Sequence, residues 1–271
     1  MKIEVGESLM RSWLRHVQGC QFAELNWKPS SSWPVCGDVQ PLMVSARDHF
    51  KSGLGVEIFG SQTAYQVLKQ GEVDVLGIRL KPNGEMGKVY SVDMAFHEAG
   101  LNYGSVSETV NRVLKKLIRS IMIIRSVFGF LPQQVAFASP VVGQPYVSAL
   151  NKVMQALEEF LLGQQIPCEA LLNVNDSFRE MVLDPVIAVS SDVADTSELF
   201  LRSYQLLNIF APYADLAAAT RATGPSDPDG AGVLRFEFDP DPPEVFKARL
   251  LETKIARITI HYQDGHTEDR I

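Results

Sequence analysis

The sequence predicts an α/β fold in which helices flank a mixed central sheet, with a small α+β module at the C-terminal end. Strand-like and helix-like segments alternate from residue 70 to residue 213, the pattern of layered α/β proteins. The pair Asn83-Gly84 separates the first two of these strands, which predicts an antiparallel hairpin. Residues 217–232, "AAATRATGPSDPDGAG", have the composition of a linker. We therefore expect a domain over residues 1–214, a linker over 215–232 and a module over 233–271.

Apolar residues at helical spacing predict the first helices of the chain. The N-terminal helix is expected over residues 6–19, where Gly19 ends it and Glu7 lies in its first turn. Residues 20–27 follow as a strand or extended segment, and residues 28–34 as a loop. Further helices are expected over 41–52 and 61–71, separated by a short strand or turn at 55–59.

The longest predicted helix covers residues 105–129, where Ser105 or Ser107 can cap the start and Glu108 suits the first turn. After it we expect strands at 133–140 and 168–174 and helices at 148–163, 175–183 and 196–213. The C-terminal module is expected to contain a strand at 233–238, a helix at 242–254 and a hairpin at 256–270 built on Asp264-Gly265. Because the chain stops at this last strand, we expect either a truncated chain or an edge strand that a partner completes.

Composition indicates an ordinary globular protein of the reducing cytoplasm. Hydrophobic residues make up 46% of the 271 residues and charged residues 21%. There is no apolar run long enough for a membrane span and no apolar signal core at the N-terminus. Cys20, Cys36 and Cys168 show no spacing that suggests zinc. The net charge of −7 gives no whole-protein attraction to nucleic acid, so such a role requires a locally basic face or a metal.

Two neighbouring strands each carry an aspartate: Asp74 in "QGEVDVLGIRL" and Asp93 in "KVYSVDMAFHEAGL". Antiparallel pairing across the hairpin can bring the two carboxylates side by side. Adjacent carboxylates repel unless one is protonated or a cation lies between them. Oxygen ligands of this kind suit Mg²⁺ or Mn²⁺. Strand alternation predicts that Asp93 faces a polar surface or a cleft together with His97.

A purely structural interpretation of these acids is also open. Each aspartate can cap a turn or pair with Arg79, Lys81 or Lys88. Charges placed in a strand need such a partner if the strand is buried.

The first helix carries a glutamate, each of the two following acidic strands carries an aspartate, and a long helix comes next. This order of elements and acidic residues resembles the PD-(D/E)xK superfamily of restriction-endonuclease-like nucleases. The matching residues are Glu7, Asp74 in "VDVLGI" and Asp93 in "SVDMAF". The phrase "VDMAFHEAGLNYG" before a Lys/Arg-bearing helix further resembles bacterial members of that superfamily. The resemblance covers roughly residues 1–140, about half of the chain, and its motifs are short. It implies a restriction-endonuclease-like sheet.

The chain departs from this family pattern at Ala95, where the superfamily usually has a lysine two residues after the second acid. In some members the lysine comes from another element, and Lys115 and Lys116 on the following helix are the candidates here. Arg112 and Arg119 border the same helix face and, with His97, are candidates for binding nucleic acid. His97 and Glu98 are also candidates for extending the site. A solvated basic helix surface is the structural alternative.

The resemblance implies metal-dependent hydrolysis of phosphodiester bonds, with DNA as the favoured substrate. Asp74 and Asp93 would hold Mg²⁺ or Mn²⁺, which activates water, and Glu7 would bind or orient a second cation or a water. Lys115 or Lys116 would stabilise the transition state. Cutting both strands of a duplex would favour a homodimer.

Two other classes of protein remain open. Ala95 and the acidic net charge favour a catalytically inactive relative that binds nucleic acid or acts as a scaffold. A small-molecule enzyme on an α/β sheet ranks last, because the sequence contains no GxGxxG, GxxxxGK[ST] or GxSxG motif.

Overall fold

The computed structural model describes residues 5–34, 39–97, 99–190, 192–193 and 196–207, together with three short strands nearer the C-terminus. The chain divides into two compact units, residues 1–205 and residues 206–271. The expected linker at 215–232, the expected helix at 242–254 and the Asp264-Gly265 turn lie outside the described residues.

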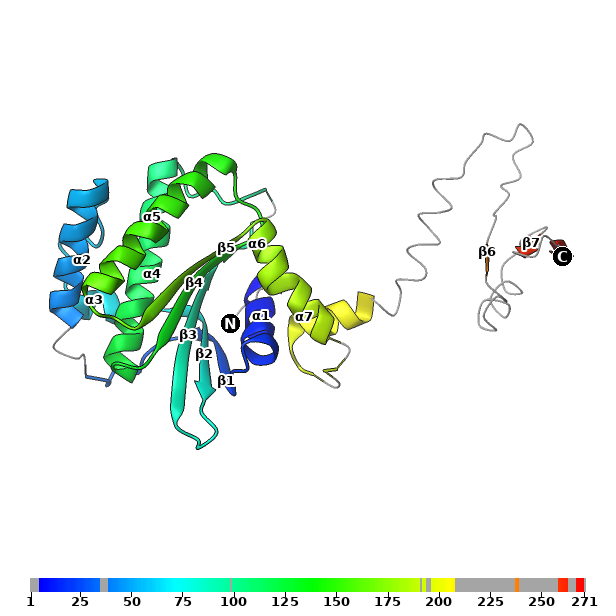
Figure 1. The fold of residues 1–271 in the computed structure, drawn as a ribbon, viewed down its shortest axis with the longest axis horizontal. Helices are drawn as coiled ribbons and strands as arrows, with labels where there is room; N and C mark the ends of the chain where they lie inside the picture. The colour runs from blue at the N-terminus through cyan, green and yellow to red at the C-terminus, as the bar shows by residue number, and fades with distance from the viewer. Residues whose placement is uncertain are drawn as a thin grey trace. The chain divides into compact units, whose positions relative to one another are not determined.

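The first unit is built on a mixed five-stranded sheet, as the sequence predicts (Figure 1). Its strands follow one another in chain order: β1 (Phe22–Trp27), β2 (Val73–Leu80), β3 (Met86–Met94), β4 (Gln133–Ser139) and β5 (Cys168–Val174). β1, β2 and β3 pair antiparallel, whereas β3, β4 and β5 pair parallel. The hairpin at Asn83-Gly84 joins β2 to β3, and Gly84 has a φ of +84° that favours glycine.

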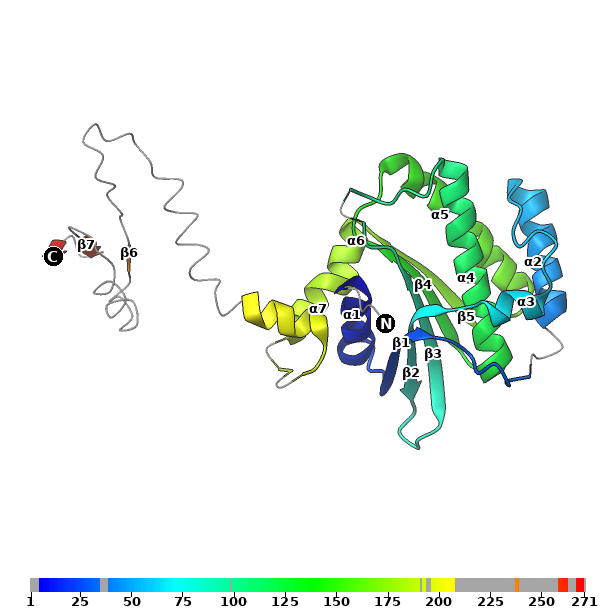
Figure 2. The ribbon, with the colours of Figure 1, turned by 180° about the vertical axis from the view of Figure 1, so that it is seen from behind.

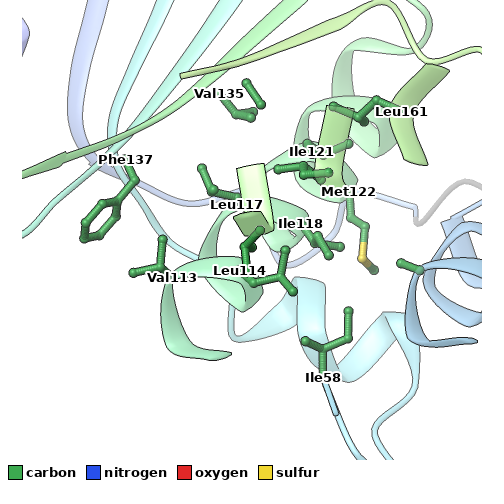
Figure 3. Close-up of a cluster of buried hydrophobic side chains, with 14 of the residues drawn as sticks. Ile58, Val113, Leu114, Leu117, Ile118, Ile121, Met122, Val135, Phe137 and Leu161 are labelled. Carbon is green, nitrogen blue, oxygen red and sulfur yellow. The ribbon is translucent and has the colours of Figure 1, made fainter. Parts of the chain in front are cut away.

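Four helices lie on one side of this sheet (Figures 1 and 2). α4 (Val106–Phe128) and α5 (Gln144–Gly163) are the crossovers of the parallel strands, and α2 (Val39–Leu54) and α3 (Ala64–Lys69) pack beside them. Figure 3 shows the resulting core, in which apolar side chains of α4 meet Val135 and Phe137 of β4 and Leu161 of α5. Val113, Leu114, Leu117, Ile118 and Ile121 of α4 are at most 1% exposed. This apolar stripe explains why α4 keeps one face on the sheet.

The opposite face of the sheet is covered by N-terminal and C-terminal segments of the unit. These are α1 (Val5–Ser12), the π-helical turn η1 (Trp13–Val17), α6 (Asp176–Phe178), η2 (Arg179–Leu183) and α7 (Asp184–Val189), with a further helix over 199–207. The buried Glu198 carboxylate fixes the last helix to the first. It accepts a hydrogen bond from Ser12 Oγ at 2.5 Å and pairs with Arg15 at 2.6 Å.

Two local features refine the expected elements. Residues 55–59 form a turn rather than a strand, because Gly55 adopts φ +65° and the Val56 amide donates back to the Phe50 carbonyl, which closes the end of α2. Gly71, after α3, passes so close to α4 that a Cβ there would lie 2.6 Å from Ile123 Cδ1.

The second unit contains a three-stranded sheet of β6 (Glu237–Phe238), β7 (Ile258–Tyr262) and β8 (Thr267–Arg270). β7 and β8 pair antiparallel, as the expected hairpin requires. No helix in the described part of the chain is sufficiently long and apolar to cross a membrane.

Candidate active site

The hairpin brings the two aspartates together on adjacent strands. Val75 of β2 pairs with Val92 of β3, and the same antiparallel register continued by one residue sets Asp74 opposite Asp93. The Asp93 side chain is 1% exposed and that of Asp74 is 18% exposed. The carboxylates therefore lie in a partly dry setting, where their mutual repulsion is strong.

Lys116 of α4 supplies the charge that offsets this repulsion. Its Nζ lies 3.1 Å from Asp93 Oδ1 and 3.4 Å from Asp74 Oδ2. One turn later on the same helix face, Ser120 Oγ donates to Asp93 Oδ2 at 3.0 Å. The Met94 amide donates to Asp74 Oδ2 at 2.8 Å. Asp93 Oδ1 is buried and receives no aligned hydrogen bond from the described residues, so the Lys116 ammonium is its charge partner there.

The start of α4 sets the position of this lysine. Ser105 caps the helix by accepting a hydrogen bond from the Glu108 amide, and the Glu108 carboxylate accepts one from the Ser105 amide at 2.7 Å. From that fixed end, the apolar stripe of α4 lies on the sheet, and Lys116 comes to lie over the ends of β2 and β3.

The environment changes the proton affinity of two members of the cluster. Burial, and then the charge of Asp93, raise the pKa of Asp74 to about 6, against the opposing effects of Lys116 and the Met94 amide. Burial alone would lower the pKa of Lys116, but the charges of Asp93 and Asp74 outweigh it and the pKa lies above its usual value. Lys116 is thus held as an ammonium ion.

Two expectations about these acids are wrong. Asp93 faces neither a polar surface nor an open cleft, because α4 covers this side of β3 and buries Asp93 beside Ser120. The cations expected as structural partners are engaged elsewhere. Lys81 pairs with Glu85 at 3.2 Å and Lys88 with Glu169 at 2.8 Å, while the Arg79 guanidinium lies 5.8 Å from the Tyr90 ring centre.

A basic cleft of about 320 Å³ opens beside the cluster. Its lining residues are Phe59, Gln62, Val67, Gln70, Tyr103, Arg112, Lys115, Lys116 and Arg119. Among these described lining residues none is acidic, although the chain as a whole has a net charge of −7. The buried Nε of Arg119 finds no hydrogen-bond acceptor in the described part of the chain. The cleft is therefore suited to an anion.

Tyr103 forms a wall of the basic cleft next to the carboxylates. Burial raises its pKa, and the charges of Asp74 and Asp93 act in the same direction. The ring lies between His97, at 5.9 Å between ring centres, and the Arg112 guanidinium, at 5.4 Å. His97 thus lies near the cleft through Tyr103, and Arg112 is held over an aromatic face.

The remaining expected site residues are placed differently. Glu7 accepts a hydrogen bond from Asn26 Nδ2 at 3.2 Å. Asn26 lies on β1 between Leu25 and Trp27, which pair with Val75 and Val73 on either side of Asp74. Lys115 lines the basic cleft without contacting either aspartate. Glu98 lies outside the described residues. Within the described ranges no three His, Cys, Asp or Glu side chains gather in a group that could hold a metal ion.

Sequence reasoning missed three groups of the cluster. Ser120 follows Lys116 by four residues, a spacing that places both on one helix face, and this signal was available. The Met94 amide carries no side-chain signal. Tyr103 sits in the loop "GLNYG", where only its aromatic ring beside a glycine marks it.

No family model, curated protein or solved structure matches the chain.

Proposed function

We propose that this chain is a metal-dependent nuclease that hydrolyses phosphodiester bonds of nucleic acid, with DNA as the favoured substrate. The observation that carries the proposal is the cluster of Asp74, Asp93 and Lys116, of which Lys116 lines the basic cleft. Two acids and a lysine are the groups that PD-(D/E)xK nucleases use, and here the lysine comes from α4 instead of position 95.

The donor set fits Mg²⁺ or Mn²⁺. These cations need only one or two carboxylates from the protein and complete their shells with water and substrate phosphate. Asp93 Oδ1, which lacks an aligned donor, and the neighbouring Asp74 would hold the ion. When bound, the ion would supply an activated water and offset charge on the scissile phosphate.

The chain's own residues would perform the other tasks. Lys116, kept charged by the two acids, would stabilise negative charge that develops on the phosphate. Arg112, Lys115 and Arg119 would hold phosphates of the strand in position. Ser120 would orient the Asp93 carboxylate through its hydrogen bond.

Nicking of a supercoiled plasmid tests this proposal. We expect cleavage that requires Mg²⁺ or Mn²⁺, stops with chelator, and falls in Asp93→Asn by more than about 100-fold, beyond the loss typical for an outer-sphere partner. Asp184→Asn is the control, since Asp184 of α7 is half exposed and pairs with Arg179 of η2. The control should cleave like the unchanged protein.

A catalytically inactive nucleic-acid-binding protein is the second candidate. Lys116 already pairs with both carboxylates and offsets one of their two charges, and Ala95 is 2% exposed and offers no cation. Divalent-independent binding of DNA with no nicking, together with calorimetry that detects no Asp93-dependent Mn²⁺ binding, would establish this alternative. Absence of both binding and nicking would refute both candidates.

A further inference from the structure

A second cavity, which we call the aromatic pocket, follows the basic cleft along α4. It has a volume of about 240 Å³, and its walls include Trp33, Tyr65, Lys28 and Lys69. Its floor includes Ile123 and Ser126 of α4. α3 separates the two cavities: Val67 and Gln70 line the basic cleft, and Leu68 and Lys69 line the aromatic pocket.

One face of α4 contributes lining residues to both cavities. Lys116 and Arg119 line the basic cleft, and Ile123 and Ser126 line the aromatic pocket. These residues follow at spacings of three or four, so they share a helix face. Arg119 and Ile123 are four residues apart, which is about 6 Å along the helix axis. α3 and Gly71 pack on α4 between the two cavities, so a ligand that occupies both at once must cross the exposed side of α3, a helix of six residues.

The aromatic pocket presents rings that are exposed and held in place. Trp33 is 49% exposed, yet its indole N–H donates to the Ser126 carbonyl at 3.2 Å, which ties it to α4. Tyr65 is 55% exposed, and the Lys69 ammonium lies 5.6 Å from its ring centre. Exposed aromatic rings beside a basic groove are the features with which proteins bind single-stranded nucleic acid, because bases stack on the rings.

The size and charge of the aromatic pocket favour one base rather than a larger ligand. Its volume lies below the range of about 300–1,000 Å³ typical of drug-sized ligands. Lys28 and Lys69 are the basic residues among those that line the pocket. Lys28 Nζ lies 2.5 Å from a carboxylate oxygen of Glu72, which is not a lining residue. None of the described residues that line it is acidic. A base inside a duplex is stacked and paired, so only an unpaired base can enter.

We propose that the aromatic pocket binds one unpaired base of a single-stranded nucleic acid whose backbone follows α4 through the basic cleft. This inference rests on the proposed function and narrows its substrate to nucleic acid that offers an unpaired base, which includes single strands and the unwound stretches of a supercoiled plasmid.

Binding of short oligonucleotides in chelator, where no cleavage occurs, tests the inference by fluorescence anisotropy. The probes are three oligonucleotides of equal length: a thymidine DNA, a uridine RNA and a DNA made of abasic sites. Trp33→Ala and Tyr65→Ala should each weaken binding of the thymidine probe by about 5- to 150-fold, the worth of one stacked base. Binding of the abasic probe should not change.

Two further variants separate stacking from folding. Trp33→Phe keeps a ring but loses the hydrogen bond to Ser126, and should weaken thymidine binding by no more than about fivefold. Phe22→Ala removes a ring that is 60% exposed at the far end of β1 and should have no effect. Melting temperatures of all variants check that the fold is retained.

Equal affinities for thymidine and abasic probes, or unchanged binding in Trp33→Ala, would overturn the inference. Plasmid nicking by the unchanged protein would then still support the nuclease, so the two proposals can fail separately. The ratio of uridine to thymidine affinity assigns the strand to RNA or DNA.

Discussion

At the scale of single residues, Lys116 is the group on which the cluster depends. It is the cation beside both Asp74 and Asp93, and Asp93 is almost fully buried. This lysine and the Ser120 hydroxyl offset the desolvation free energy of burying Asp93 as an anion.

Lys116→Met should lower the free energy of unfolding by about 3–5 kcal/mol, the cost of leaving a buried charge unpaired. Lys115→Met, one position away but not in contact with the acids, should change it by less than about 0.5 kcal/mol. Urea denaturation measures both. Adding Asp93→Asn to Lys116→Met should restore most of the loss, and similar losses in the two lysine variants would contradict the pairing.

Asp74 makes stability depend on pH. Its folded-state pKa, about 6, lies above the unfolded value of 3.8, so the folded protein holds this proton more tightly. The contribution of Asp74 is therefore fully present below the unfolded pKa and is lost as pH rises through about 6. Asp74→Asn removes this dependence, and its stability relative to the unchanged protein should increase between about pH 4 and pH 6 and stay level above about pH 7. Urea denaturation at each pH measures the free energy of unfolding of both proteins. If the two free energies change in parallel with pH, the pKa of Asp74 is not raised by folding.

At the scale of elements, local sequence signals predict most of the fold. Capping residues and apolar spacing place the start of α4 within one residue, and the Asn83-Gly84 turn predicts the β2–β3 hairpin. The pairing of Asp74 with Asp93 follows from that turn. The π-helical turn η1 was not foreseen, since the single helix expected over 6–19 changes its hydrogen bonding at Trp13, where no proline or glycine marks the change.

The position of Lys116 over the acids was among the alternatives that the sequence left open. Helical spacing puts Lys115 and Lys116 about 100° apart, and only packing of α4 on the sheet decides which one reaches β2 and β3. The burial of Asp93 escaped prediction for a similar reason, because strand alternation does not reveal that both faces of β3 are covered.

The basic face of α4 should bind phosphate without regard to base. Arg119→Ala should weaken binding of thymidine and abasic oligonucleotides alike and reduce the slope of log affinity against log salt by about 0.7. Salt titration of anisotropy measures this, with Lys152→Ala on α5 as the exposed control. If only the thymidine probe is affected, Arg119 contacts a base instead.

At the scale of the whole molecule, the candidate site belongs to the first unit alone. Its contacts, both cavities and both apolar cores lie within residues 5–201. A fragment of residues 1–207 should therefore fold in one cooperative transition and retain metal-dependent nicking. Circular dichroism melting and the plasmid assay check this. Loss of nicking by a folded fragment would show that the second unit takes part in the reaction.

The contrast between overall and local charge also acts at this scale. The chain has a net charge of −7, whereas the described lining of the basic cleft contains four basic residues and no acidic one, so the proposed nucleic acid would be attracted there. Composition alone counted against a nucleic-acid partner because it averages over the surface, and the clustering of Arg112, Lys115, Lys116 and Arg119 in one cleft appears only once α4 is placed on the sheet.

The lysine bridge has a consequence for how the protein matures. In small zinc domains the bound ion stabilises the native state, and removing the ion unfolds the chain. Here an amino group built into the polypeptide already contacts both acids and offsets one of their two negative charges. Newly made protein can thus reach its native form before any ion arrives, and a later encounter with a divalent ion would change what the molecule does without deciding whether it is folded.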